Sequence, residues 1–358
     1  MSIRDIRQRE FADTWLESER FSIINAAPRF GKIRMSVNIL NEYAEDANVL
    51  IAYPDNKIRK SWDDEFEELA YTNPSVEFTT HLSLWKCVKK YDLVIIDEIH
   101  LLSSAQIEVC KELFLLNKEV LGLTGTLSYF TQGALKSELG LRVLIHYPIK
   151  QAIEEGVLPD YEITVLKVPL DDKIYQLFGK KRKTEFGRMR NLMWIVGNEK
   201  EDEEPSFFVR LKIIEVLKNS ISKLNKTKAL IKQYQDERIL VFCGFIKIAD
   251  NLGIPSYHSK SSESQIFQDF TEGKINHLAV INIGTSGVTY LPLSRVIINY
   301  FSSSAEDMAQ KILRCMSFEY DNPKKVAKIS IITSTEKIEN RWLNKALAFF
   351  DKSKIKYS

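Results

Sequence analysis

The segment YDLVIIDEIH, residues 91–100, joins a strand pattern to a pair of carboxylates. Its apolar residues 93–96 are typical of a strand that is buried on both faces of a parallel sheet. Asp97 and Glu98 follow at once, so both carboxylates would emerge at the C-terminal end of that strand. Ligands of open α/β sheets bind at this end. The segment therefore predicts an α/β fold with an acidic site at the edge of its sheet.

Comparable apolar runs recur along the chain, separated by stretches long enough for crossover helices: NVLIAYP, VLGLTGT, RILVFCG, HLAVINIG, SRVIINYF and AKISIITS. This α/β pattern occurs twice, on either side of the segment YPIKQAIEEGVLPDYEI, whose break at residues 156–159 indicates a linker. We predict two domains, residues 1–150 and 151–358, each a mostly parallel sheet flanked by helices.

The charged stretch between these strand series has no strand pattern. It carries the basic run KKRKTEFGRMR and then the acidic run NEKEDEE, so we expect a charged helical insertion at about residues 171–205. Such runs usually form solvated faces, and the alternative is a basic element that touches phosphate. The apolar spacing over residues 207–234 predicts one or two long helices.

Composition limits the class of protein. The 358 residues suffice for two cores, and 44% hydrophobic with 27% charged residues is typical of a globular protein. No apolar run has the roughly 18 residues of a membrane span, and the N-terminus MSIRDIRQRE lacks a signal region, so we expect a cytoplasmic protein. The four cysteines form no C-x-x-C pair and are interpreted as core residues. The net charge of +2 does not by itself indicate a polyanionic partner.

The segment SIINAAPRFGKIRMS, residues 22–36, places a loop between a strand and a helix-competent stretch. A phosphate-binding loop needs a glycine for close approach and a lysine for the β and γ phosphates, which Gly31 and Lys32 provide. Ala26 replaces the usual first glycine and Ile33 the usual magnesium-binding hydroxyl, so an ordinary turn is the alternative. The candidate nucleotide-binding residues are Ala27, Pro28, Arg29, Phe30, Gly31, Lys32 and Ile33.

The two carboxylates that follow the strand at residues 93–96 would take part in phosphoryl transfer at the same site. Asp97 would hold Mg²⁺, and Glu98 would orient or deprotonate the attacking water, because phosphoryl transfer depends on positioning and electrostatics. An acidic helix N-cap is the alternative.

The order of lysine loop, IAYPDNKIRKSWDDEF, TTHLSLW, DEIH and LTGT resembles the first motor domain of superfamily 2 helicases of the DExH type. The resemblance implies two tandem RecA-like domains with the nucleotide site in the cleft between them. It further implies that Gln8 contacts adenine, for which an exposed polar residue on a first helix is the alternative, and that His100 couples the nucleotide to the second domain. It places Thr124 and Thr126 in a motif that couples hydrolysis to strand movement, and Pro54, Lys57 and Thr80 on the nucleic-acid track.

The second half continues the resemblance. Thr285 and Ser286, in GTSG, match a motif that contacts the tracked strand, although a Gly-Ser turn would have the same residues. Gln310 and Arg314 match an element whose arginine reaches the γ phosphate and would stabilise charge in the transition state. The sequence departs from the family pattern at three further positions that concern the nucleotide site: Thr289, Leu313 and Ser317.

The resemblance therefore implies an enzyme that uses ATP and Mg²⁺: a monomeric DNA helicase or translocase that remodels forked, branched or single-stranded DNA. The small size is similar to phage-encoded members, which act in the host cytoplasm with replication or recombination proteins. DNA is favoured over RNA by the DEIH form and the linker. The alternatives are a non-catalytic nucleic-acid-binding module derived from a decayed helicase, and the motor subunit of a restriction or repair complex.

Overall fold

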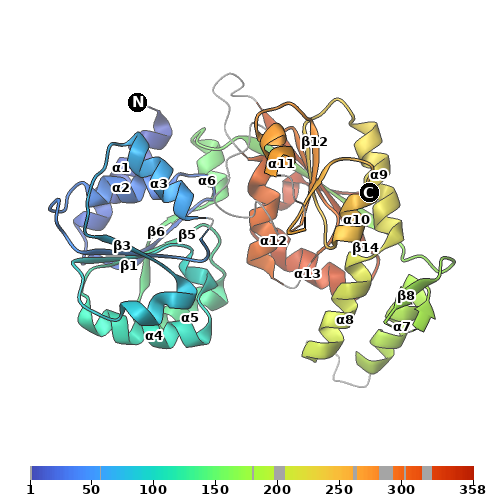
Figure 1. Ribbon diagram of the computed structural model, residues 1–358, viewed down its shortest axis with the longest axis horizontal. Coiled ribbons are helices and arrows are strands. Elements are labelled where there is room, and N and C mark those ends of the chain that lie inside the picture. Colours follow the sequence, from blue (N-terminus) through green and yellow to red (C-terminus); the bar gives the residue numbers. More distant parts are fainter. Residues whose placement is uncertain are drawn as a thin grey trace. The chain divides into compact units, whose positions relative to one another are not determined.

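The computed structural model describes residues 2–56, 58–179, 181–196, 206–260, 264–281, 293–301, 304–316 and 325–358 (Figure 1). The described residues form two compact units, one within residues 2–159 and one within residues 160–358. Five residues named above lie outside the described part: Lys57, Thr285, Ser286, Thr289 and Ser317.

The first unit is built on a parallel sheet with the strand order β3-β2-β4-β5-β1-β6. Its strands are β1 (Phe21–Ala26), β2 (Val49–Tyr53), β3 (Val76–Thr80), β4 (Leu93–Ile96), β5 (Val120–Thr124) and β6 (Arg142–Tyr147). Its helices are α1 (Ile3–Leu16), α2 (Lys32–Leu40), α3 (Arg59–Glu68), η1 (His81–Cys87), η2 (Ile99–Leu101), α4 (Ser104–Leu116), α5 (Tyr129–Leu139) and α6 (Ile149–Glu154). Figure 1 shows α1, α2 and α3 on one face of the sheet and α4 and α5 on the other.

This layering explains why the central strands are mainly apolar. Every residue of β2, β4 and β5 is buried, since helices cover both faces. The edge strand β6 instead alternates between exposed and partly buried residues until its last position. Helix α6, within the segment expected as a linker, belongs to the first unit.

The second unit has a parallel sheet with the order β11-β12-β10-β13-β14-β7-β15. Its strands are β7 (Asp160–Val168), β10 (Ile239–Phe242), β11 (Ser256–Tyr257), β12 (His277–Val280), β13 (Arg295–Ile298), β14 (Val326–Ser334) and β15 (Ile355–Tyr357). Its helices are α8 (Phe207–Lys218), α9 (Ile221–Gln233), α10 (Ile246–Asp250), α11 (Ser264–Thr271), α12 (Ala305–Ile312), η3 (Leu313–Cys315), α13 (Lys337–Leu347) and η4 (Lys352–Lys354). The predicted α/β class with parallel sheets is confirmed, as are the long helices before β10.

A buried polar group lies in the interior of the second unit. The side chains of Lys223 and Glu339 form an ion pair and neither is exposed to solvent. The other carboxylate oxygen of Glu339 accepts a hydrogen bond from the Ser334 amide at 2.7 Å. This pair joins α9 to α13 and to the end of β14.

The charged stretch after β7 contains secondary structure that the sequence pattern did not predict. Strands β8 (Gln176–Phe178) and β9 (Lys181–Lys183) form an antiparallel hairpin, followed by helix α7 (Glu185–Val196). The helix agrees with the expected helical insertion, whereas the hairpin corrects the expectation of no strand there. Three-residue strands are too short to show a recognisable period.

Two further expectations concern burial and membranes. Cys87, Cys110 and Cys243 are free and buried, as expected of core residues. Over the described ranges, no helix combines the length and the apolar character that crossing a membrane requires.

Candidate functional site

The carboxyl edge of the first sheet brings together motifs that are far apart in sequence. Thr80 pairs with Tyr53 in the parallel register, so Pro54 and Thr80 stand at the ends of adjacent strands. Both residues are half-buried. Asp97 follows β4, Thr124 ends β5, and the loop after β1 lies beside them, because all these strands run in the same direction.

The loop between β1 and α2 has the backbone of an anion-binding turn. The Ala27 amide donates to the Tyr147 carbonyl at 2.8 Å, which fixes the start of the loop to β6. Pro28 and Arg29 are half-buried, and Arg29 has a positive φ of 67°. Gly31, with φ at 90°, precedes the first residue of α2, so amides of the first helical turn lie at the end of the loop.

Phe30 of this loop packs in a cluster of aromatic side chains. Phe30 is fully buried, and its ring centroid lies 5.1 Å from that of Phe11 and 5.3 Å from that of Tyr147. The Tyr147 hydroxyl donates to Glu155 at 2.9 Å, and Glu155 also accepts two hydrogen bonds from Arg7. Phe11, Tyr147 and Glu155 could not be predicted from the sequence, because contacts between α1, β6 and the residue after α6 leave no local pattern.

Gln8 contacts the loop directly. Its side chain is 1% exposed, and its amide nitrogen donates to the carbonyls of Phe30 at 2.7 Å and Gly31 at 3.3 Å. In this structure, Gln8 therefore holds the backbone of the candidate phosphate loop. A Cβ at Gly31 would overlap the Gln8 amide nitrogen, so the contact requires glycine.

A chain of polar contacts runs from the loop to β5. Lys32 Nζ lies 3.5 Å from Glu98 Oε1, and Glu98 Oε2 lies 3.4 Å from His100 Nδ1. His100 Nδ1 is 2.9 Å from the Thr124 hydroxyl. The structure thus brings together four predicted residues from three separate motifs. Glu98 has a φ of 49°, and this left-handed backbone lies at the turn that leads into η2.

Asp97 is buried at the centre of this edge, with 4% of the residue exposed. Burial raises the pKa of its carboxyl and the adjacent Glu98 carboxylate raises it further, whereas Lys32 and the Trp62 indole lower it. A carboxylate in such surroundings is stabilised by a bound cation.

His81 and Trp62 are residues near Asp97 that the sequence analysis left unassigned. His81 is buried, and its Nε2 lies 2.9 Å from the Asp97 carbonyl oxygen. Trp62 in α3 is fully buried. His81 occurs in the quoted segment TTHLSLW, directly after Thr80, but the register that brings it to β4 exists only in the folded sheet.

The loop Thr124–Gly125–Thr126 packs against the phosphate loop. A Cβ at Gly125 would lie 3.0 Å from Lys32 Nζ and 3.0 Å from Pro28. Thr126 is 2% exposed, and its hydroxyl has no hydrogen-bond partner among the described residues. A buried hydroxyl without a hydrogen-bond partner among the described residues suits a site that admits a polar ligand or water.

These residues fit ATP with Mg²⁺. The loop presents helix amides and Lys32 to an anion, and Asp97 offers the hard oxygen donor that Mg²⁺ prefers. Ile33, second in α2, is half-buried and supplies no oxygen, so Asp97 and water would complete the metal shell.

In the second unit, the predicted residues occupy α12 and the turn after it. Gln310 is half-buried in α12, and Arg314 in η3 is 9% exposed. Leu313, which stands at the usual glycine position, is 1% exposed and therefore packs in the core. Lys311 was not predicted; it is 2% exposed, and its ammonium group donates to the Tyr300 hydroxyl at 2.8 Å.

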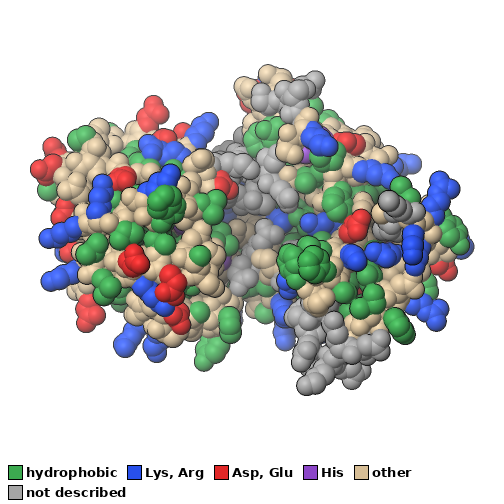
Figure 2. All heavy atoms as spheres, turned by 60° about the horizontal axis from the view of Figure 1, so that its bottom comes forward, with side chains coloured by type: hydrophobic (Ala, Val, Ile, Leu, Met, Phe, Trp, Pro, Cys, Tyr) green, Lys and Arg blue, Asp and Glu red, His purple; other side chains and the backbone are tan. Residues whose placement is uncertain are grey.

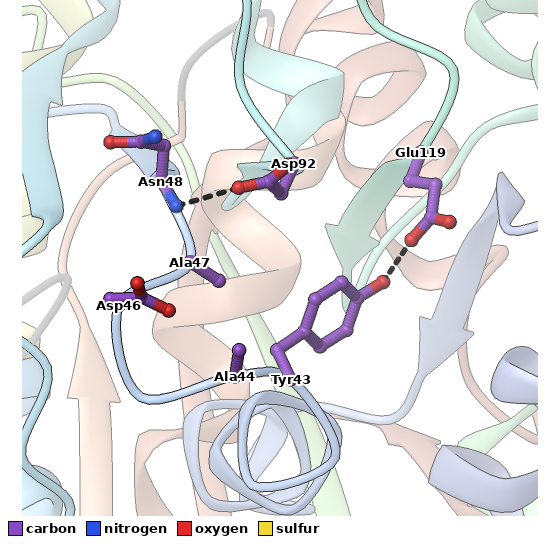
Figure 3. A pocket seen from close by; sticks show the side chains of 7 residues that line it. All are labelled: Tyr43, Ala44, Asp46, Ala47, Asn48, Asp92 and Glu119. Carbon is purple, nitrogen blue, oxygen red and sulfur yellow. Dashed lines mark hydrogen bonds between the residues drawn. The ribbon is translucent and has the colours of Figure 1, made fainter.

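A pocket of about 450 Å³ lies at the opposite edge of the first sheet (Figure 3). Asn48, Asp92 and Glu119 line it and directly precede β2, β4 and β5, so it faces the amino ends of the strands. The backbone amide of Asn48 donates to the Asp92 carboxylate at 2.8 Å. Its acidic lining does not suit a nucleotide phosphate, and the candidate site is therefore the carboxyl edge.

Comparison with known proteins agrees with this architecture. Residues 222–319 match the model of the helicase conserved C-terminal domain. No curated protein sequence matches the chain.

Three solved structures have a similar fold, and two of them are named as helicases. Dbp5 of S. cerevisiae, bound to RNA and ADP BeF3, is 13% identical with a TM-score of 0.64, over 98% of this chain and 88% of that one. The helicase Lhr of Mycobacterium smegmatis, bound to ssDNA and AMP-PNP, is 12% identical with a TM-score of 0.54, over 96% and 47%. The Hef helicase domain of Pyrococcus furiosus is 13% identical with a TM-score of 0.53, over 96% and 99%. The chain thus has the tandem RecA-like fold of these proteins, and its residues 222–319 match the helicase conserved C-terminal domain.

Proposed function

We propose that this protein is an ATP-dependent DNA helicase or translocase that remodels forked or branched DNA. The observation that carries the proposal is the ion pair between Lys32 and Glu98, 3.5 Å apart at the end of a phosphate-type loop. In this pair, the lysine of the candidate phosphate loop contacts the residue expected to activate water. The helicase match over residues 222–319 and the fold support the same class.

In the proposed cycle, Lys32 exchanges its contact with Glu98 for the β and γ phosphates of ATP. The amides at the start of α2 donate hydrogen bonds to the same phosphates. Glu98, released from Lys32, then orients the attacking water and accepts its proton. Asp97 would hold Mg²⁺, which neutralises phosphate charge when it is bound.

The contacts of His100 suggest how ATP hydrolysis is coupled to the residues that bind DNA. His100 lies between Glu98 and Thr124, so a shift of Glu98 changes the hydrogen bonding of the loop that contains Thr124 and Thr126. We propose that this loop, with Pro54, Lys57 and Thr80, guides one DNA strand, and that Thr285 and Ser286 contact it from the second domain. We further propose that Gln310 and Arg314 act on the nucleotide, where Arg314 would stabilise charge on the γ phosphate.

Two substitutions test the chemistry. Lys32→Ala removes the charge that holds the phosphates, so both ATP binding and turnover should be lost. Glu98→Gln leaves the loop intact, so turnover should be lost while binding of a fluorescent ATP analogue is retained. DNA-stimulated phosphate release measures turnover, and wild-type turnover in both variants would exclude the proposed motor.

The DNA part requires its own experiment. Binding should depend mainly on phosphate contacts, so affinity should fall steeply with salt and vary little with sequence. At one fixed salt concentration, a forked substrate should compete better than blunt duplex of the same length. Equal affinity for both would remove branch remodelling from the proposal, and stimulation by RNA alone would replace DNA as the substrate.

A further inference from the structure

An arm extends from the body of the second unit after β7 (Figure 1). We define the arm as the hairpin β8–β9, helix α7 and the exposed start of α8, which are residues 173–179, 181–196 and 206–211 of the described chain. Neither sheet includes any part of it. Its stability must therefore come from contacts at its base.

The base of the arm is firmly anchored. Glu185, at the start of α7, is fully buried, and its carboxylate accepts hydrogen bonds from the Ser220 hydroxyl at 2.9 Å and the Gln176 amide at 2.8 Å. It also accepts from the backbone amides of Asp171 and Ile221. Apolar residues of α7 pack with α8 and α13 in one cluster: Met189, Leu192, Ile213, Val216, Leu217, Ile338 and Trp342.

The outer surface of the arm is rich in large apolar side chains. Trp194 is 72% exposed, Tyr175 is 68% exposed and Phe208 is 74% exposed. Further exposed apolar residues are Leu177, Phe186, Ile195, Phe207 and Leu211. Since the anchoring cluster is made of other residues, these rings do not hold the arm together. Exposed aromatic groups at this density indicate a binding surface.

The charge of the arm indicates which kind of molecule binds to it. Residues 173–196 contain seven lysines and arginines and a single carboxylate, Glu185. That carboxylate is buried and fully engaged, whereas Lys173, Lys181, Arg182 and Arg190 are exposed. Figure 2 shows hydrophobic and basic side chains side by side on the unit that carries the arm. The acidic residues of this region, 199–204, follow α7 in sequence and lie outside the described residues.

We propose that the arm is a second binding surface for single-stranded DNA, outside the motor motifs. Exposed rings would stack on unpaired bases while the basic side chains contact phosphates. Duplex DNA fits less well, because its base faces are already stacked. A protein partner would match the rings but would need its own acidic surface, whereas a polynucleotide supplies both features at once. The inference rests on the proposed DNA translocase, and it adds a DNA-binding surface on the second unit.

Direct binding by the full chain tests this proposal without nucleotide. The affinity of the protein for a labelled 20-nucleotide oligo-dT can be measured by fluorescence anisotropy. Trp194→Ala combined with Tyr175→Ala should weaken this affinity on the order of tenfold. Lys181→Ala combined with Arg182→Ala should also weaken binding. Each phosphate contact with a single strand contributes about 0.7 to the slope of log affinity against log salt, so the loss of two contacts should reduce this slope by about 1.4. A blunt duplex of the same length should respond less to the ring substitutions.

Matched controls separate the arm from general effects. Leu115→Ala removes an apolar group that is 87% exposed in the first unit, and Lys136→Ala with Lys150→Ala removes two exposed charges there. Both should leave oligo-dT binding unchanged. Equal loss in the controls and in the arm variants would overturn the assignment to the arm, as would an unchanged affinity in the arm variants.

Tryptophan fluorescence gives a second, independent readout. Of the five tryptophans, Trp15, Trp62 and Trp342 are buried, and only Trp85 and Trp194 are exposed. In a Trp85→Phe background, oligo-dT should quench the emission of Trp194, and the quench should disappear in Trp194→Phe. Loss of quenching together with retained affinity in that variant supports stacking, because phenylalanine can still stack. No quench in the Trp85→Phe background would overturn the proposal.

The outcomes also distinguish the arm from the motor. If arm variants bind like wild type while DNA-stimulated ATPase persists, the arm proposal fails and the motor stands. If wild type binds oligo-dT through the arm but never hydrolyses ATP, the motor proposal fails alone.

Discussion

The imidazole of His81 donates a hydrogen bond from Nε2 to the backbone carbonyl of Asp97, across 2.9 Å. A carbonyl can only accept, so the contact requires the Nε2–H tautomer. His81 directly follows Thr80 at the end of β3, and Asp97 follows β4. Strand β2 lies between these two strands, so this hydrogen bond joins the predicted DNA track to the predicted metal ligand past the end of β2.

Substitution His81→Phe would leave the buried Asp97 carbonyl without this donor. A lost partner of this kind costs about 1–3 kcal/mol, so the free energy of unfolding of the first unit should fall by that order. We also expect a lower kcat, because Asp97 is less firmly placed. His81→Gln retains a donor and should recover part of both losses, as measured by urea unfolding and phosphate release. Identical behaviour of the two variants would mean that only packing matters at this position.

Gly31→Ala should impair the phosphate loop. A Cβ at this position would overlap the Gln8 amide, and φ of 90° is unfavourable for alanine. We expect weaker ATP binding and a lower Tm. Gly133→Ala is the matched control, because no atom lies within 4 Å of its Cβ position in α5; it should raise stability by up to about 1 kcal/mol. Normal ATP affinity in Gly31→Ala would contradict the described contact.

Glu155 should make the first unit sensitive to acid. Burial raises its pKa, but hydrogen bonds from Arg7, Gln151 and Tyr147 outweigh this and lower the pKa below its ordinary 4.5. A lowered folded-state pKa means that the stabilisation is present above about pH 4.5 and is lost as the pH falls further. The Tm difference between wild type and Glu155→Gln should therefore be large at pH 7 and decrease below pH 4.5.

The neighbouring Glu154 provides the control for that measurement. It is 62% exposed and lies 3.9 Å from Lys150, so Glu154→Gln should change Tm little at any pH. A Glu155→Gln difference that stays constant down to pH 3 would contradict the ionic role of Glu155.

Ile33→Thr should restore a hydroxyl at the usual metal-binding position of the loop. One neutral ligand contributes on the order of 1 kcal/mol, so the Mg²⁺ concentration for half-maximal ATPase should fall several-fold. DNA affinity at saturating Mg²⁺ should not change. Because Ile33 is half-buried, melting temperatures must be measured together with the magnesium titration. An unchanged metal midpoint with a lower Tm would assign Ile33 to packing alone.

The buried pair Lys223 and Glu339 should show strong coupling. Either Lys223→Met or Glu339→Gln removes one partner and leaves the other without its counter-charge, at a cost of about 3–5 kcal/mol. The double variant should lose much less than the sum of the single losses. A double-mutant cycle by urea unfolding measures this coupling, and additive losses would show that the two charges are stabilised independently.

The central strands and the acidic edge could be predicted from the sequence. The residues of β4 are apolar without interruption because helices cover both faces of the sheet, and this burial leaves a run that can be recognised locally. Gly31 with Lys32, and Asp97 with Glu98, could be found because each pair directly follows such a strand. Hydrophobic periodicity and chain direction were enough to place them at one edge.

Edge strands and supporting residues were not predictable in the same way. Strand β6 alternates weakly, and β15 has three residues, so neither has a pattern distinct from a loop. The hairpin of the arm is equally short. Only pairing with a neighbour makes these segments strands, and pairing is a property of the folded sheet.

The sequence by itself determined the α/β class, the order of the central strands' motifs and the residue types at the phosphate loop, because these depend on local burial and on spacing along the chain. Only the tertiary structure decided that Gln8 holds the carbonyls of Phe30 and Gly31, that His81 reaches Asp97, and that Glu185 is the buried anchor of the arm. Each of these hydrogen bonds joins groups whose distance is set by strand register or helix packing, and a polar side chain carries no local signal of the buried partner that will satisfy it.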